Sequence, residues 1–163
     1  MKTARETLIQ VEIEKIIAES TIIRNHAYNL STIPGFSKTS ALWFLVECGS
    51  IARFPNVRSF LSYAGVSPTV KSSAGKIYSA HINRHSNKYL RSMLYNAAKV
   101  VCNITKEKSG LKIYAERVKR RKNGRGKLNT CIVASKIARI AYSILKNGTK
   151  FDKKLGINAK ITI

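Results

Sequence analysis

Apolar residues recur at helical spacing over most of the chain, and the first thirty residues carry the longest such pattern. Steps of four and three residues alternate there in a heptad seam with one polar interruption, made of Ile9, Ile13, Ile16, Ser20, Ile23, Ala27 and Leu30. The seam predicts a long helix over residues 3–30. Such a helix is typical of a coiled coil that joins two copies of a chain or braces another domain, and equally of an amphipathic helix packed on its own domain. The 9–30 seam is therefore our candidate surface for a homo-oligomer.

A Pro-Gly turn and a second helix follow. Pro34 and Gly35 break the first helix, and Ser37 can cap the next one. A helix, a Pro-Gly turn and a helix over residues 31–49 have the layout of a helix-hairpin-helix element, in which backbone N–H groups at the start of the second helix bind a DNA phosphate. We therefore assign Gly35, Ser37 and Lys38 to DNA contact, and the alternative is a plain helical corner.

Further periodic segments predict a helical bundle. Their helices are expected over residues 55–63, 87–104, 111–121 and 128–145. Asn87 can cap the second of them, and its apolar stripe consists of Leu90, Leu94, Ala97, Val101 and Ile104. Between the first two of these lies a Ser- and Gly-rich loop with a short strand around 76–82. The fold class that follows is all-α, or mainly α, with a long N-terminal helix, a helix-hairpin-helix element and a small bundle interrupted by one irregular Ser-rich loop. We divide the chain into a coiled-coil-like helix (1–30), a helical domain (31–148) and a C-terminal tail (149–163).

The distribution of charge along the chain indicates that this predicted helical bundle binds another molecule. The 163 residues include 30 Lys and Arg against 8 Asp and Glu, a formal net charge of +22. Residues 1–49 hold five of each sign, so the whole excess lies from Ser50 onward. Solvated faces normally mix signs, whereas a one-sided excess is typical of a protein that binds nucleic acid. The cations that we assign to DNA are Lys76, Arg84, Lys88, Arg91, Arg120, Arg121, Arg125 and Lys127.

The same composition predicts several absences. Metal-dependent nucleases hold divalent cations with clustered carboxylates. Four of the eight acids here lie on the predicted N-terminal helix and the other four are scattered, so we expect no metal site and no cofactor in this chain. The start of the chain lacks the apolar stretch of a secretory signal, and no apolar run approaches the roughly 20 residues of a membrane-spanning helix. We expect a cytoplasmic, nucleoid-associated protein of a prokaryotic cell, without a membrane partner. Cys48, Cys102 and Cys131 are expected to be reduced, buried thiols.

The Ser-rich loop is the one candidate for catalysis. Ser72 and Ser73 have Lys, Arg and His residues close by in the sequence, and a loop hydroxyl among cations can attack a phosphodiester because the cations stabilise the transition state. Composition alone does not separate this interpretation from the ordinary one, in which loop serines cap helices or meet solvent.

Ordered motifs resemble one family. They are Leu30-x-x-Ile33-Pro34-Gly35, Arg53-Phe54-Pro55, Tyr63-Ala64-Gly65-Val66-x-Pro68, Ser72-Ser73, Asn87-x-Tyr89-Leu90-Arg91 and Asn96-Ala97-Ala98. Over roughly residues 27–148 the chain resembles the C-terminal transposase domain of insertion-sequence family one-ten, with its relatives one-sixteen and nine-oh-two.

The resemblance implies a recombinase with two parts. An N-terminal RuvC-like domain would bind Mg²⁺ through a DEDD acidic tetrad, a coiled coil would lead to the helical domain, and a structured bridge RNA would guide DNA pairing. Ser73, eight residues after Gly65, falls where the family has its nucleophilic serine, and Ser72 is the fallback. Attack by this serine would leave a covalent phosphoserine–DNA intermediate.

Two departures from the family pattern lie near this serine. Ala74 stands where the family has glycine, and His85 and Ser86 replace a basic–Gly pair. Because the acidic domain is lacking, we expect the chain to be the C-terminal piece of a transposase, either a truncated or frameshifted copy or an excised piece. The rival interpretations are a non-catalytic helix-hairpin-helix protein that binds duplex DNA and, more distantly, a ribosomal-type RNA-binding protein.

Overall fold

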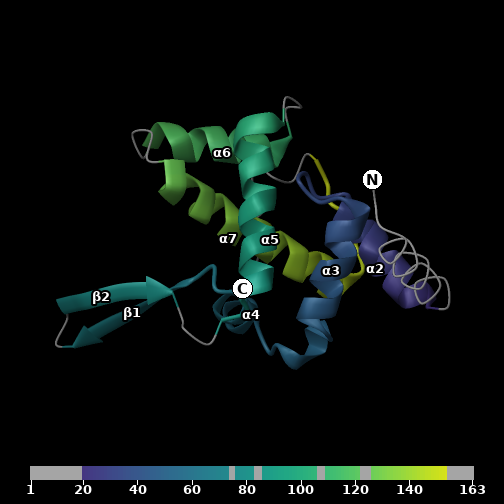
Figure 1. Cartoon of the computed structure of the whole chain (residues 1–163), viewed down its shortest axis with the longest axis horizontal. Coiled ribbons are helices and arrows are strands. Elements are labelled where there is room, and N and C mark those ends of the chain that lie inside the picture. The colour runs from purple at the N-terminus through teal and green to yellow at the C-terminus, as the bar shows by residue number, and fades with distance from the viewer. Residues whose placement is uncertain (1–19, 74–75, 83–85, 106–108, 122–125, 154–163) are drawn as a thin grey trace, which may run out of the picture.

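Helix α7 (Gly126–Asn147) is the longest described helix of the computed structural model, and α2, α4, α5 and α6 all contact it (Figure 1). The structure describes residues 20–73, 76–82, 86–105, 109–121 and 126–153, and over 68–82 it describes the backbone only. The other described helices are α2 (Thr21–Ser31), α3 (Lys38–Cys48), α4 (Val57–Tyr63), α5 (Lys88–Lys99) and α6 (Gly110–Arg121). A 3-10 turn (Ile51–Arg53) joins α3 to α4, and a π-helical turn (Val100–Ile104) extends α5.

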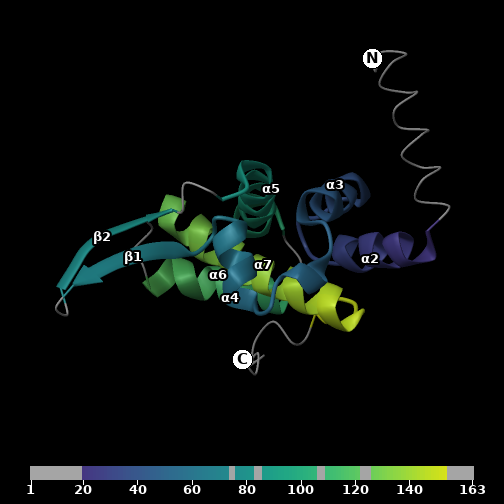
Figure 2. The same ribbon diagram turned by 90° about the horizontal axis from the view of Figure 1, so that it is seen from below.

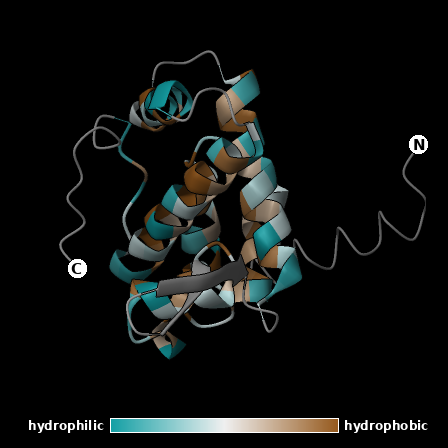
Figure 3. Cartoon of the chain, turned by 90° about the vertical axis from the view of Figure 1, so that its left-hand side faces the viewer, coloured by the Kyte–Doolittle hydropathy of each residue, from teal (hydrophilic) through white to brown (hydrophobic). Residues whose placement is uncertain are grey.

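The helices enclose one core that is closed by aromatic rings. Phe60 of α4 lies at its centre, 6.2 Å from the ring of Phe44, 5.2 Å from Phe54 and 5.7 Å from Tyr142 between centroids. Apolar residues alternate with polar ones around the helices, as the period of an amphipathic helix requires (Figure 3). The mainly helical class predicted from the periodicity is confirmed.

The segment predicted as an irregular loop is instead a β-hairpin, and this is the main correction to the predicted fold. Strand β1 (Pro68–Ser73) pairs antiparallel with β2 (Lys76–Ile82), with Pro68 opposite Ile82, Ser73 opposite Lys76 and an irregularity after Lys71. The hairpin projects from the bundle in both views of the chain (Figures 1 and 2). The density of serine and glycine hid the β-formers of these strands, and only the strand over 76–82 was predicted.

The predicted helix over 3–30 is interrupted. Ser20 has an extended backbone (φ −115°), and its hydroxyl accepts a hydrogen bond from the N–H of Ile23 (3.4 Å), so it caps α2 and no single helix passes through it. Serine at such a place competes with the helix for backbone hydrogen bonds. In the described part of the 9–30 seam, Ala27 and Leu30 are buried whereas Ile23 is 39% exposed. Residues 1–19, and with them the first half of the seam, lie outside the described residues.

The end of α5 also differs from the prediction. Leu90, Leu94, Ala97 and Val101 are buried as the stripe predicts, but Ile104 is 68% exposed. The π-helical turn at Val100–Ile104 causes this, because its wider i to i+5 spacing rotates the last residues off the buried face. The ammonium of Lys112 closes the turn by donating to the carbonyls of Val101 (3.2 Å) and Cys102 (3.0 Å).

Two smaller expectations need correction. By length and composition α7 is apolar enough to cross a membrane, contrary to the expectation that no segment approaches that size. A core helix passes the same test, and 56% of the most apolar stretch of α7 is buried inside the fold. Of the three thiols, all free, Cys48 is buried, Cys102 is half-buried and Cys131 is exposed, so burial is confirmed for Cys48 alone.

Candidate nucleic-acid interface

The two chain segments at the base of the hairpin are tied together by Asn87. Its backbone N–H donates to the carbonyl of Tyr63 (2.7 Å), and its side-chain amide donates to the Glu47 carboxylate (2.8 Å) and the Tyr63 hydroxyl (3.3 Å). Its side-chain oxygen accepts from the N–H groups of Tyr89 (2.9 Å) and Leu90 (3.0 Å), which caps α5 as predicted. Asn87 therefore joins the hairpin base to α3 and α5.

A glycine completes this base and positions a predicted DNA-binding cation. Gly65 has φ +66°, and a Cβ there would lie 2.5 Å from the hydroxyl oxygen of Ser86. That hydroxyl accepts a hydrogen bond from the guanidinium of Arg91 (3.0 Å). Because Gly65 has no Cβ, the Ser86 side chain has the space it needs to make this bond. A side chain at position 65 would displace Ser86 and release Arg91.

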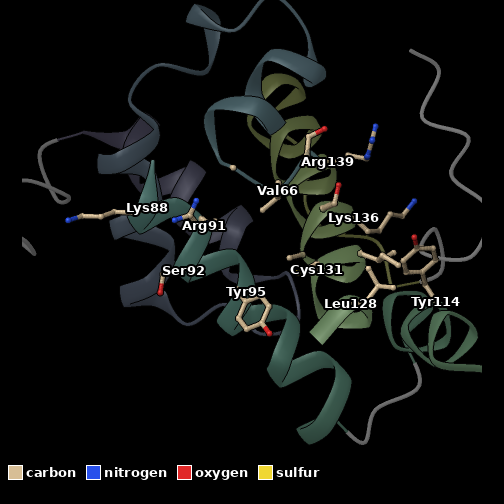
Figure 4. A pocket seen from close by; sticks show the side chains of 15 residues that line it. Val66, Lys88, Arg91, Ser92, Tyr95, Tyr114, Leu128, Cys131, Lys136 and Arg139 are labelled. Atoms are coloured by element: carbon tan, nitrogen blue, oxygen red, sulfur yellow. The ribbon is translucent and has the colours of Figure 1, made fainter. Parts of the chain in front are cut away.

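A groove opens beside the hairpin base, between α5 and α7, with a volume of about 810 Å³ (Figure 4). From α5 it is lined by residues at helical spacing: Lys88, Arg91, Ser92 and Tyr95. From α7 it is lined mainly by a second such series: Leu128, Cys131, Ile132, Ser135, Lys136 and Arg139. Gly65, Val66, Ser67, Ala134 and, from α6, Tyr114 complete the lining. Among these described residues there is no Asp or Glu.

The groove changes character along its length. In Figure 4, Tyr95 and Tyr114 stand on either side of Leu128 and Cys131, whereas Arg139 lies nearer to Val66 at the hairpin base. An aromatic end is thus followed by a cationic end. Burial, and then the charge of Arg139, lower the pKa of Lys136 from its usual value. A negative charge placed nearby would therefore stabilise the charged form of Lys136.

The structure separates Ser72 and Ser73 from this groove. Ser73 is the last residue of β1, at the end of the hairpin far from the bundle, and lies opposite Lys76 in the strand register. Five steps along a strand span about 17 Å, so the groove at the hairpin base does not reach it. His81 pairs with Thr69 near the base, which places it away from Ser73. Within the described strands, the register brings Lys76 opposite Ser73, and no other Lys, Arg or His lies opposite either serine.

Two helices joined by a turn at Pro34 and Gly35, α2 and α3, form the layout from which a helix-hairpin-helix element was predicted, but the glycine faces inward. Gly35 has φ +93°, and a Cβ there would lie 2.6 Å from the carbonyl oxygen of Ala97 in α5. Ser37 and Ser40 form a capping box, in which the N–H of each is bonded to the hydroxyl of the other. Lys38, at the first position of α3, is exposed. Gly35 therefore serves helix packing, whereas Ser37, which caps α3, and Lys38 are both exposed.

The remaining predicted cations fall into two places. Lys88 and Arg91 line the groove. Arg120 and Arg121 in the last turn of α6, and Lys127 in the first turn of α7, are exposed at the junction of those helices. Arg84 and Arg125 lie outside the described residues.

Sequence reasoning missed the α7 side of the groove. Lys136 and Arg139, with Tyr95 and Tyr114, were not predicted to bind anything, although the spacing of the two cations on one apolar helix was a usable signal. Among the described residues no group of three His, Cys, Asp or Glu side chains is placed to hold a metal ion. The expectation that this chain needs no cofactor stays a prediction.

Comparison with known proteins places the chain in a family. Residues 27–115 match the family described as Transposase IS116/IS110/IS902. The chain is 30% identical over 153 residues to the transposase for insertion sequence element IS1328 of Yersinia enterocolitica, covering 87% of this chain and 43% of that protein. It is 28% identical over 130 residues to an uncharacterised protein of insertion element IS110 of Streptomyces coelicolor, covering 77% of this chain and 30% of that protein. It is 26% identical over 153 residues to the pilin gene-inverting protein of Moraxella bovis, covering 91% and 46%.

The chain thus spans less than half the length of these curated relatives. The family match covers more than half of the chain itself and includes the turn at Gly35, the whole hairpin and its base at Asn87. The motifs from which the resemblance was drawn all lie within this range, so the recognition is confirmed, although the match ends at residue 115 and the resemblance was drawn to residue 148. This chain belongs to the IS116/IS110/IS902 family of transposases.

Proposed function

We propose that the chain is the DNA-binding C-terminal part of an insertion-sequence transposase and that Ser73 is its nucleophile in DNA strand exchange. The Ser73 oxygen would form a bond to a DNA phosphorus while the bond from that phosphorus to one sugar oxygen breaks. The serine proton leaves to water, and the departing sugar oxygen takes one up. The exchange conserves a phosphodiester-like bond, so no ATP is required.

The observation that carries the proposal is the hairpin. It holds Ser73 at its far end, opposite Lys76, while its base lies beside a cationic groove of the bundle. A hydroxyl at the end of a projecting ribbon can enter a DNA groove, and a β-ribbon fits the major groove of duplex DNA. The net charge of +22 favours a polyanionic partner for the same surface.

The remaining partners follow from the family. Strand exchange would need a RuvC-like domain with its acidic tetrad and Mg²⁺, and a guide RNA would choose the target. The 9–30 seam would join two copies. The exposed cations at the α6–α7 junction are where we place the contact with a DNA or RNA backbone.

The test is to trap the covalent intermediate. The chain is combined with cognate junction DNA, with the guide RNA and with the RuvC-like domain of its own transposase, and the products are separated under denaturing conditions. The wild-type chain should give a protein–DNA adduct that Ser73→Ala abolishes and the matched Ser72→Ala variant retains. Loss of the adduct in Ser72→Ala with retention in Ser73→Ala would move the role to Ser72.

A second candidate function is non-catalytic binding through the helix-hairpin-helix element, which the capped, exposed start of α3 favours. It predicts no adduct with the wild-type chain in the reconstituted mixture and duplex binding that Ser73→Ala leaves unchanged. A ribosomal-type RNA-binding protein would instead prefer structured RNA to duplex DNA.

A further inference from the structure

The groove between α5 and α7 has an aromatic and apolar lining that is not needed to bind the backbone of a DNA duplex. Exposed lysines and arginines suffice to hold a duplex, because its phosphates lie on the outside and its bases are stacked inside. Here the cationic end leads into a hollow lined by two tyrosines and by apolar atoms of Leu128 and Cys131. A hollow of about 810 Å³ is within the range of sites that enclose a small organic molecule, roughly 300–1,000 Å³.

The arrangement of groups matches the two halves of a nucleotide. A base is flat, polarisable and able to stack on an aromatic ring, and its phosphate is anionic. The aromatic end of the groove holds Tyr95 and Tyr114, and the cationic end holds Arg91, Lys136 and Arg139. From Leu128 to Arg139 the α7 face of the groove extends about 16 Å, which accommodates a base and its phosphate end to end.

Each tyrosine also has an ammonium group over one face of its ring. The nitrogen of Lys99 lies 5.1 Å from the ring centroid of Tyr95, and that of Lys136 lies 5.6 Å from that of Tyr114. A base would stack on the opposite face of either ring, with its phosphate within reach of a cation already in place. Since no acidic side chain is among the described residues of the lining, nothing there repels that phosphate.

We propose that this groove binds an unpaired nucleotide of a single strand, with its base between Tyr95 and Tyr114 and its phosphate on Lys136 and Arg139. The proposal deepens the proposed function, and it rests on that function in requiring a nucleic-acid partner. The nucleotide would be one displaced from a duplex during strand exchange or one in a single-stranded part of an RNA, since both present the same base and phosphate chemistry. Bases that remain paired cannot enter the groove.

Cys131 provides a probe inside the groove. It is exposed, whereas Cys48 is buried and Cys102 half-buried, so alkylation followed by peptide mass analysis reports its accessibility separately. The experiment measures the alkylation rate of the full chain with saturating oligothymidylate, oligouridylate or a blunt DNA duplex of equal phosphate number. Duplex binding is measured alongside by fluorescence anisotropy.

A single strand should slow alkylation of Cys131 about tenfold or more relative to the duplex, which controls for screening by charge. Tyr95→Ala should weaken single-strand binding about 5- to 150-fold, the loss expected for one stacked base, and leave duplex affinity unchanged. Tyr95→Phe should retain binding. Tyr28→Ala is the control, because Tyr28 also has an ammonium over its ring, that of Lys150 at 4.8 Å, but it is more exposed than Tyr95 and lies on α2, outside the groove.

The two single strands identify the source of the nucleotide. Stronger protection of Cys131 by oligouridylate would indicate that the nucleotide comes from an RNA. Protection by oligothymidylate that is as strong or stronger would indicate that the groove also accepts a nucleotide of displaced DNA. Equal protection of Cys131 by duplex and single strands, or equal losses in Tyr95→Ala and Tyr28→Ala, would overturn the proposal. Absence of duplex binding in the anisotropy arm would instead contradict the proposed function, so the two failures are distinguishable.

Discussion

Replacement of Gly35 by alanine separates a packing role from a DNA-binding role at the α2–α3 turn. Sequence reasoning assigned Gly35 to phosphate contact, whereas the structure places its Cα against the backbone of α5. A Cβ at this position would lie 2.6 Å from the carbonyl oxygen, 3.0 Å from the Cα and 3.1 Å from the carbonyl carbon of Ala97. All three atoms belong to a helix backbone, which cannot move aside as a flexible side chain would.

Two costs add in this variant. A non-glycine residue at positive φ costs about 1–2 kcal/mol, and forcing an extra methyl into a packed contact costs a further ~1–3 kcal/mol. Gly35→Ala should therefore lower the free energy of unfolding by about 2–5 kcal/mol. For a chain of this size that corresponds to a melting temperature lower by about 4–20 °C.

The control is Gly148→Ala. Gly148 has a similar positive φ of +66°, and a Cβ added there would meet no atom within 4 Å, so only the backbone cost of ~1–2 kcal/mol applies. Urea unfolding gives the loss of unfolding free energy in each variant, and the difference between the two losses is the steric contribution at position 35. Both variants replace glycine by alanine, so the lower entropy of the unfolded chain is the same in each and cancels in the difference. Equal losses in the two variants would refute the close approach to α5. A Gly35→Ala protein of normal stability that binds duplex DNA more weakly would restore the phosphate-contact role.

Three further predictions use other parts of the molecule. Duplex binding that involves about six phosphates should give a slope near −5 in log affinity against log salt, and a slope near zero would exclude a backbone-dominated contact. Asn87→Ala should lower the free energy of unfolding more than Asn56→Ala, for which the loss of a helix cap is expected to cost about 0.5–2 kcal/mol. The reason is that Asn87, unlike Asn56, also bonds Glu47 and Tyr63. Equal losses of unfolding free energy in urea would contradict the bridging role of Asn87. Burial raises the pKa of the Cys48 thiol from 9.0 to about 11, so the stability that the protonated thiol contributes is complete below pH 9 and is lost as the pH rises toward 11. Urea unfolding over that range should show a shallower decline in Cys48→Ala, and identical declines would contradict the burial effect.

The local interactions of this protein were readable from its sequence because they act between near neighbours. Ser37 and Asn87 cap α3 and α5 as predicted, and the buried stripe of α5 follows from helical spacing up to Val101. The family motifs gain a physical meaning in the structure. Tyr63, Gly65 and Asn87 lie in two separate motifs, and they meet at the base of the hairpin.

The hairpin was missed because its signal is not local. Strand pairing depends on neighbours across the two strands, whereas serine judged by its own preference is typical of a loop, so the serines of β1 did not indicate a strand. The groove was missed for a related reason. Tyr95, Tyr114 and Lys136 come from three different helices, and the residue spacing within one helix does not predict which residues of another helix lie beside it.

The chain by itself determined its helical character, its caps, its excess of positive charge and its membership of the transposase family, because each of these depends on residue type and short-range order. Only the tertiary structure decided that Gly35 faces a helix backbone, that Ser73 stands at the end of a ribbon and that an aromatic end and a cationic end share one groove. The position of Ser73 follows from the pairing of β1 with β2. The other two features arise where helix faces distant in the sequence pack together, and that packing is selected by the fit of the whole core.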